Sequence, residues 1–172
     1  MYKQKKVSRT DLHKISIISS RQKDNTGCMW HSIYSLTQNI DFLNYQNDNS
    51  PFRFLLIVQY YGYLLWPLLA IPKKMPVKVE HWKELYKRCN AHQVKLKLLV
   101  STNMNASDEH VIAVEADFEN DIMKLMDPKT GEFHQMDWES ILCSDFRNVY
   151  EILVLDSGDL DDYRIIPPKV II

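Results

Sequence analysis

The sequence predicts an α+β fold in which a helical N-terminal half packs on a C-terminal antiparallel sheet. In the first half, apolar residues recur at spacings of three and four, as on the buried face of a helix. After residue 93 the pattern changes to period two, which is typical of strands. Helices first and strands later are the order expected of an α+β domain.

The N-terminal part begins with two minor elements and then a helix. Residues 1–14 are polar and rich in lysine, and we expect a loosely held arm there. The apolar run Ile15-Ser16-Ile17-Ile18 predicts a short strand that leads into a polar loop. A helix is expected over residues 28–39, because apolar residues follow helical spacing there behind the turn at 24–27.

The next element is a helix over residues 52–61, expected to be buried because most of its faces are apolar. An uncharged run from Phe54 to Ile71 begins within this helix, and the run is only just long enough to span a bilayer. Polar residues and a glycine interrupt that run. We therefore expect no membrane span, but a buried helix that breaks near Gly62 and resumes near Leu64.

Three prolines mark the expected seam between the helical half and the sheet half: Pro67, Pro72 and Pro76. An amphipathic helix is predicted over residues 80–92, where apolar side chains recur at spacings of three and four. From Val94 to Leu98, apolar residues alternate with Lys95 and Lys97, which predicts a strand with one face in water.

Further strands are predicted to complete the antiparallel sheet, over residues 109–117, 121–127 and 147–155. A hairpin turn at residues 119–121 joins the first two of them. Residues 137–142 are expected to form a short helix capped by Asp137. The resulting division is an arm (1–14), one domain (15–155) and an acidic, then apolar, C-terminal tail (156–172).

The composition is that of one ordinary globular domain. The chain has 172 residues, of which 45% are hydrophobic and 25% charged, which is enough for a single substantial core. The formal net charge of -1 gives no field that would attract nucleic acid. The sequence contains no glycine-rich phosphate-binding motif, so phosphate chemistry has no support.

The cysteines indicate neither a disulfide framework nor a structural metal site. There are three, Cys28, Cys89 and Cys143, far apart and without a C-x-x-C pair. We expect no metal and no cofactor, and we assign structural roles to Cys89 and Cys143. No apolar segment follows the basic N-terminus, so no cleaved signal peptide is expected. The chain is expected to be cytoplasmic as synthesised, and export by a dedicated secretion route stays open.

Cys28 is the strongest candidate for chemistry. It stands at the predicted helix start, where the positive end of the helix dipole favours the thiolate, the nucleophilic form of the side chain. Gln22 stands six residues earlier in the polar loop, and its side-chain amide could donate to an oxyanion that forms beside the sulfur. Asn25, in the same loop, is the alternative donor.

His110 and Asp127 are the candidates for a base and for the group that orients it. His110 begins one predicted strand and Asp127 ends the next, so the hairpin would put the two side by side. Asp127 would then accept the imidazole Nδ1–H. Asp127 also precedes Pro128 and could cap a turn, a role compatible with the first. His31, one turn after Cys28, is the alternative base.

The order of these residues resembles that of papain-like cysteine peptidases. The closest resemblance is to the compact bacterial branch that includes the double-glycine leader peptidases. That branch shows Q-x5-C at a helix start, and here Gln22 and Cys28 match it. A histidine, an apolar run and D-P-x-x-G follow in that branch, and the matching residues are His110 and Asp127-Pro128-Lys129-Thr130-Gly131. The resemblance covers residues 15–155.

The resemblance implies a papain-like fold with a Cys-His-Asp triad that cleaves amide bonds through a thioester. Cys28 would attack a carbonyl carbon, His110 would act first as base and then as acid, and Asp127 would hold the imidazole. The Cys28 N–H and Gln22 would stabilise the oxyanion. A cysteine peptidase acting on a protein or peptide is the first expectation. Deamidation or transglutamination of a protein glutamine, as in small papain-like bacterial effectors, is the alternative. A catalytically inactive binding module of the same fold is the third.

Overall fold

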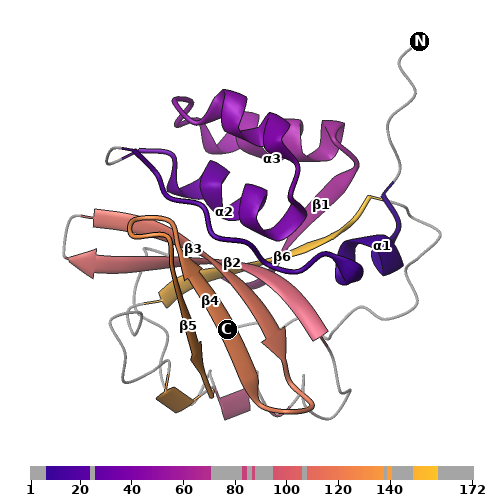
Figure 1. Ribbon diagram of the computed structural model, residues 1–172, viewed down its shortest axis with the longest axis vertical. Coiled ribbons are helices and arrows are strands. Elements are labelled where there is room, and N and C mark those ends of the chain that lie inside the picture. The colour runs from indigo at the N-terminus through magenta and orange to yellow at the C-terminus, as the bar shows by residue number, and fades with distance from the viewer. Residues whose placement is uncertain are drawn as a thin grey trace.

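The computed structural model describes residues 7–23, 26–70, 83–84, 87, 95–105, 108–137, 139–140 and 149–158. Over these ranges the chain forms a mixed structure of helices and one antiparallel sheet. Figure 1 shows the larger helices together on one face of that sheet. The predicted α+β class, with helices preceding most of the strands, is confirmed.

The sheet strands are β1 (Tyr63–Ala70), β2 (Lys95–Asn105), β3 (Asp108–Asp117), β4 (Ile122–Asp127), β5 (Glu132–Met136) and β6 (Val149–Ser157). They lie in the order β1-β6-β2-β3-β4-β5, and every neighbouring pair is antiparallel. The strands predicted over 109–117, 121–127 and 147–155 are confirmed as β3, β4 and β6. Strand β5 was not predicted, because its mostly polar sequence has no apolar alternation and its Phe133 is exposed.

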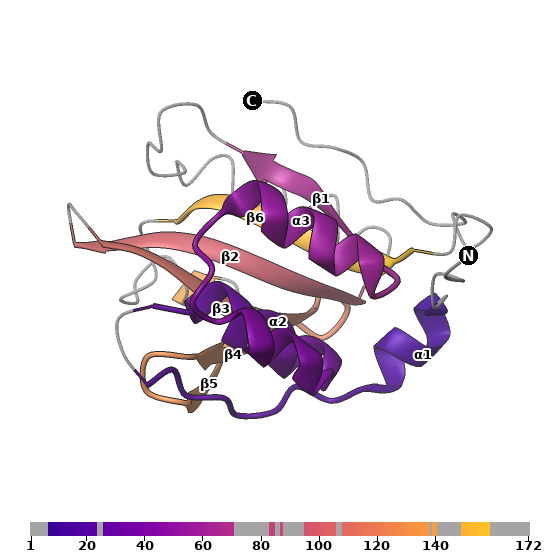
Figure 2. The same ribbon diagram turned by 90° about the horizontal axis from the view of Figure 1, so that it is seen from above.

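The helical segments are α1 (Arg9–Lys14), α2 (Cys28–Thr37), the 3-10 helix η1 (Ile40–Tyr45) and α3 (Pro51–Tyr60). Figures 1 and 2 show α2 and α3 as neighbours over the sheet. Helix α2 ends where Gln38 takes a left-handed conformation with a φ of 55°. Helix α3 begins with Pro51 in its first turn and with Ser50 as its N-cap. The helices predicted over 28–39 and 52–61 are therefore confirmed.

The predicted break near Gly62 is confirmed, but the helix before it is only partly buried and no helix resumes near Leu64, so those two parts of the prediction are wrong. Helix α3 buries Phe54 and Val58 and partly buries Ile57, but four of its large apolar side chains are exposed: Phe52, Leu55, Leu56 and Tyr60. The chain then turns at Gly62, whose φ of 93° lies in the left-handed region, and continues as strand β1. Pairing with β6 gives β1 its backbone hydrogen bonds. Pro67 is tolerated because β1 is the edge strand and its register shifts there, so this proline marks no seam.

Residues 7–14 of the predicted arm are held against the domain, and residues 1–6 lie outside the described ranges. Residues 9–14 form α1, capped by Ser8, and Leu12 in this helix is completely buried. Arg9 forms an ion pair with Asp156 of β6, with Nη2 and Oδ2 2.8 Å apart. Asp156 thus belongs to the sheet rather than to a tail, and residues 159–172 lie outside the described ranges.

Residues 15–22, which we call the strap, are extended but do not join the sheet, so the strand predicted at 15–18 is wrong. The strap uses its backbone to bind side chains and helix carbonyls instead. The Ile17 N–H donates to the carboxylate of Glu115, and the Ile18 N–H donates to the carbonyl of Ser35 in α2 over 3.2 Å. The strap therefore crosses from α1 along α2 and leads the chain to Gln22.

Two hydrophobic clusters cover the two faces of the sheet, as period-two alternation requires. The cluster on the helix side joins α2, η1 and α3 to Leu99, Ala113 and Met126. The other cluster takes the alternate residues of the same strands, including Leu98 and Val114. The central strands β2, β3 and β4 are therefore buried on both faces, which fixes the positions of their ends.

Lys97 contradicts the prediction that this part of β2 has one face in water. Its side chain is 3% exposed, and its Nζ donates to the carbonyls of Ile15 and Leu36 over 2.7 and 2.8 Å. The carboxylate of Glu115 lies 3.6 Å away. Burial lowers the pKa of Lys97, although Glu115 opposes this effect. The ammonium is tolerated because it binds the strap and the last turn of α2, where a helix favours positive charge.

The remaining expectations concern short stretches. Asp117 accepts the N–H of Asn120 over 3.1 Å, and the hairpin turn predicted at 119–121 is confirmed. Asp137 accepts the N–H of Ser140 over 2.7 Å, as expected of a helix cap. Residues 83, 84 and 87 of the helix predicted over 80–92 are helical, and its other residues lie outside the described ranges, as do Val94, Pro72 and Pro76.

Candidate active site

Cys28 is the first residue of α2, and it is partly exposed. Gly27 before it has a φ of 90°, a conformation that other residues rarely adopt, and it provides no side chain to cap the helix. A Cβ at this position would lie 3.1 Å from the carbonyl oxygen of Gln46. The first N–H groups of a helix have no partner within it, so the Cys28 N–H is a candidate donor to a negative charge beside the sulfur.

Helix α2 is oriented so that its first turn lies over the beginning of β3. The Ser32 Oγ donates to the carbonyl of Val111 over 3.1 Å. Residues four apart share one helix face, so Cys28 lies one turn before this contact. His110 precedes Val111, and Cys28 lies close enough to its imidazole to raise the pKa of His110.

His110 is hydrogen-bonded to Asp127, at the end of β4. Its Nε2 lies 2.5 Å from Oδ1 of Asp127, and both side chains are 8% exposed. The expected contact through Nδ1 is therefore wrong, because Nε2 is the atom that faces the carboxylate. This orientation leaves Nδ1 for the thiol. Asp127 also caps its own turn, since Oδ1 accepts the N–H of Lys129 over 2.9 Å, so the contact with His110 and the turn cap are compatible as expected.

The environment fixes the charges of this pair. Burial alone would lower the pKa of His110, but its hydrogen bonds to Asp127 and Cys28 and their negative charge raise it to about 9. Burial would raise the pKa of Asp127, but hydrogen bonds from His110 and from the Lys129 N–H lower it. The histidine is thus held protonated and the carboxylate ionised near neutral pH.

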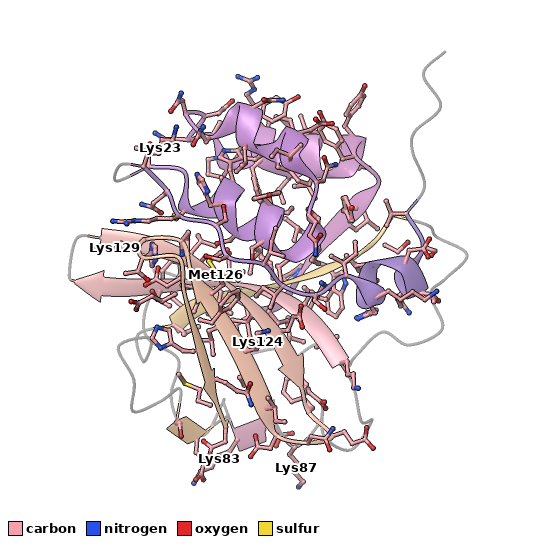
Figure 3. The ribbon with its side chains drawn as sticks, viewed as in Figure 1. Lys23, Lys83, Lys87, Lys124, Met126 and Lys129 are labelled. Carbon is pink, nitrogen blue, oxygen red and sulfur yellow. The ribbon has the colours of Figure 1, made fainter. Side chains whose placement is uncertain are left out.

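Gln22 is attached to the turn that carries Asp127. The Gln22 N–H donates to the carbonyl of Pro128 over 2.7 Å, and the Ser19 Oγ donates to the carbonyl of Gly131 over 2.5 Å. Figure 3 shows Lys23 and Lys129, the neighbours of these residues, at the same end of the molecule. The structure therefore brings the backbone of Gln22 next to the His110 and Asp127 pair.

The alternative base has a structural role. His31 is buried, its Nδ1 lies 2.7 Å from the Ser20 Oγ, and its Nε2 lies 3.1 Å from Oε1 of Gln46. Both ring nitrogens are thus used to hold the strap and the end of η1 against α2. Asn25, Cys89 and Cys143 lie outside the described residues.

Tyr150 and Ser101 are residues of this region that the sequence did not indicate. Tyr150 lies on β6, is 9% exposed, and is hydrogen-bonded to Ser101 of β2. Burial raises the pKa of Tyr150, and a negative charge on Cys28 would raise it further. A tyrosine inside an apolar strand carries no pattern that separates it from a core residue, so only the fold identifies it.

The arrangement joins a thiol, an imidazole and a carboxylate in series, which is a set suited to acyl transfer. In the described part of the chain, no cluster of three or more histidine, cysteine or acidic side chains could hold a metal ion. No helix within the described ranges has the length and apolar character needed to cross a membrane.

Comparison with protein-family models, with curated proteins and with solved structures finds no match for this chain.

Proposed function

We propose that this protein is a thiol-dependent hydrolase that cleaves amide bonds as a cysteine peptidase. Cys28 is the nucleophile, His110 the base and acid, and Asp127 the group that orients the imidazole. The observation that carries this proposal is the position of the His110 ring. It lies beside Cys28, which raises the pKa of His110, and its Nε2 is 2.5 Å from Oδ1 of Asp127.

The reaction begins with a proton transfer from the thiol to His110. The raised pKa of His110, about 9, means that the imidazole keeps this proton at neutral pH. The thiolate attacks the carbonyl carbon, a C–S bond forms, and the carbonyl oxygen takes the electron pair. The pair then returns, the C–N bond breaks, and His110 gives its proton to the leaving amine.

Hydrolysis of the thioester completes the cycle. His110 takes a proton from water, the hydroxide attacks the thioester carbon, and the C–S bond breaks to release a carboxylic acid and the thiolate of Cys28. In both steps a negative oxygen forms beside the sulfur. The Cys28 N–H at the uncapped start of α2 and the Gln22 side chain are the donors proposed for it.

The proposed resemblance to papain-like cysteine peptidases, and to their compact bacterial branch, draws support from the same arrangement. A cysteine starts the helix that covers the sheet, and the histidine and aspartate come from neighbouring strands. A primary amide of a glutamine side chain would be attacked by the same first step. Deamidation and transglutamination are therefore outcomes that the experiments below must separate from peptide cleavage.

The first experiment labels the full chain with limiting iodoacetamide near neutral pH and maps the sites by mass spectrometry. We expect Cys28 to react ahead of Cys89 and Cys143, because His110 holds it as thiolate. In the His110→Ala variant, labelling of Cys28 should slow by about tenfold or more. Equal labelling of all three cysteines in the wild type would contradict the proposed nucleophile.

The second experiment identifies the product. The protein is incubated with a mixture of peptides and intact proteins, and both new N-termini and ammonia are measured, with Cys28→Ala as the blank. New N-termini without ammonia support the peptidase. Ammonia without new N-termini identifies an amidotransfer or deamidation reaction instead. A reactive Cys28 that yields neither product would favour the inactive binding module.

A further inference from the structure

The end of the sheet under Cys28 contains a buried row of residues from three strands. Thr102 of β2 pairs with His110 of β3 on one side and with Val149 of β6 on the other. Thr102 and Val149 are fully buried and His110 nearly so. Strand β6 is therefore the strand that borders the thiol site on the side away from Asp127.

A β-bulge in β6 gives Tyr150 a special orientation. Ser101 pairs with Glu151, and the next residue, Thr102, pairs with Val149. Tyr150, between these two residues of β6, is therefore the extra residue of the bulge. Three residues of β6 belong to the hydrophobic cluster on the face of the sheet away from the helices: Val149, Ile152 and Val154. The bulge removes Tyr150 from that cluster. Bulges beside active sites commonly redirect a side chain in this way.

The phenol of Tyr150 is buried at the same end of the sheet as His110. Its side chain is buried, and its hydroxyl is hydrogen-bonded to Ser101. Burial raises the pKa of Tyr150, the bond to Ser101 lowers it, and the negative charges of Glu151 and Cys28 raise it further. The net effect is a pKa above the ordinary value, so the phenol keeps its proton near neutral pH.

We propose that Tyr150 donates a hydrogen bond to the sulfur of Cys28 and, together with His110, stabilises its thiolate form. The two donors would reach the sulfur from β6 and β3, on opposite sides of β2. This inference rests on the proposed function, because it assigns a role at the same nucleophile. It predicts that the reactivity of Cys28 depends on a group outside the Cys-His-Asp series.

The charged groups around the sulfur define what the experiment must control. They are His110 on β3, Asp127 beyond it on β4, and Glu151 next to Tyr150 on β6. Helix α2 contributes His31, whose ring is already bonded to Ser20 and Gln46. Replacement of Tyr150 by phenylalanine removes one hydroxyl and leaves all of these charges in place.

The experiment is the pH profile of Cys28 alkylation by iodoacetamide in the full chain, comparing wild type with Tyr150→Phe. We expect the midpoint of the profile to rise by about one pH unit, with about tenfold slower labelling on its acid side, as for loss of one hydrogen bond to a charged group. Ser101→Ala should shift the midpoint in the same direction by less. Tyr63→Phe, which removes a hydroxyl from another buried tyrosine in β1, should leave it unchanged.

Two results would overturn the proposal, and they differ in what else they affect. If the wild type shows a low midpoint and Tyr150→Phe shows the same one, only the role of Tyr150 is lost and the proposed function stands. If Cys28 of the wild type behaves as an ordinary thiol, both proposals fail. If Tyr150→Phe unfolds below the assay temperature, the alkylation profile of Ser101→Ala is used instead. An unchanged midpoint in that variant would contradict the role of Tyr150.

Discussion

The Nε2 atom of His110 lies 2.5 Å from Oδ1 of Asp127, and the two side chains are each 8% exposed. Backbone pairing of β3 with β4 ends at Ala113 and Met126, so this contact joins the strands beyond their last paired residues. Water is largely excluded from it, and a charge-assisted hydrogen bond is stronger in such surroundings. The pair therefore fixes both the direction of the ring and its protonation state.

This pair predicts a pH-dependent contribution to stability. A histidine whose pKa is raised by folding stabilises the fold while protonated, so its contribution is complete below 6.5 and is lost as the pH rises toward about 9. The value of about 9 includes the effect of Cys28 beside the imidazole, so the contribution of Asp127 is measured without that thiol. We therefore specify the Cys28→Ala variant, in which Asp127 is the group expected to hold the pKa of His110 above its ordinary value.

The measurement is urea unfolding of Cys28→Ala between pH 6 and pH 9.5, with Cys28→Ala/His110→Gln as the matched control. The free energy of unfolding of the single variant should fall across this range by on the order of 2 kcal/mol more than that of the double variant. The same slope in both proteins would show that His110 is not held protonated by Asp127.

Asp127→Asn separates the orienting role from the charge. The amide oxygen can still accept from His110 Nε2 and from the Lys129 N–H, so the ring keeps its direction but loses the charge that raises its pKa. We expect amide hydrolysis to fall by about tenfold to a hundredfold, whereas Cys28→Ala should abolish it. Asp117→Asn, at the turn between β3 and β4, is the control and should leave activity unchanged. Unfolding of Asp127→Asn would instead mean that Asp127 is chiefly a turn cap.

The contact between His110 and Asp127 could be predicted because each step is local. Two strand patterns separated by a turn give a hairpin, and a hairpin places the start of one strand beside the end of the next. The helix start at Cys28 follows from spacing and from the glycine before it. Which ring nitrogen meets the carboxylate could not be predicted, because that choice depends on where α2 crosses β3.

The features that the sequence did not predict correctly share one physical cause: they depend on contacts between residues far apart in the sequence. Lys97 reads as a solvated strand residue, and only the carbonyls of Ile15 and Leu36, distant in sequence, allow its burial. Strand β1 reads as a helix because its apolar residues are unbroken, and only its pairing with β6 selects the strand. Tyr150 owes its orientation to a register shift between β6 and β2, which no pattern within β6 encodes.

Lys97 predicts a large stability effect far from the proposed site. Lys97→Met removes the ammonium from two buried carbonyl contacts and from the partly exposed Glu115, whose carboxylate then lacks this cation. We expect destabilisation by about 2–4 kcal/mol in urea unfolding. Lys95→Met, two residues earlier on the same strand with its side chain 64% exposed, should change stability by less than about 0.5 kcal/mol. Equal effects of the two variants would show that the buried ammonium is not needed to hold the strap.

Gln22 tests the oxyanion site, because its proposed role appears only after attack. In the transition state the carbonyl oxygen gains negative charge, and a donor already in place stabilises that state more than the bound substrate. Gln22→Ala should therefore lower kcat by about a hundredfold or more with little change in KM. Alkylation of Cys28 forms no oxyanion, so its rate should stay near that of the wild type. The bond from the residue 22 N–H to Pro128 is made by backbone and survives the substitution. Gln59→Ala, at an exposed position of α3, is the matched control and should leave activity unchanged. Full activity in Gln22→Ala would contradict the role of Gln22 and make Asn25 the next donor to test.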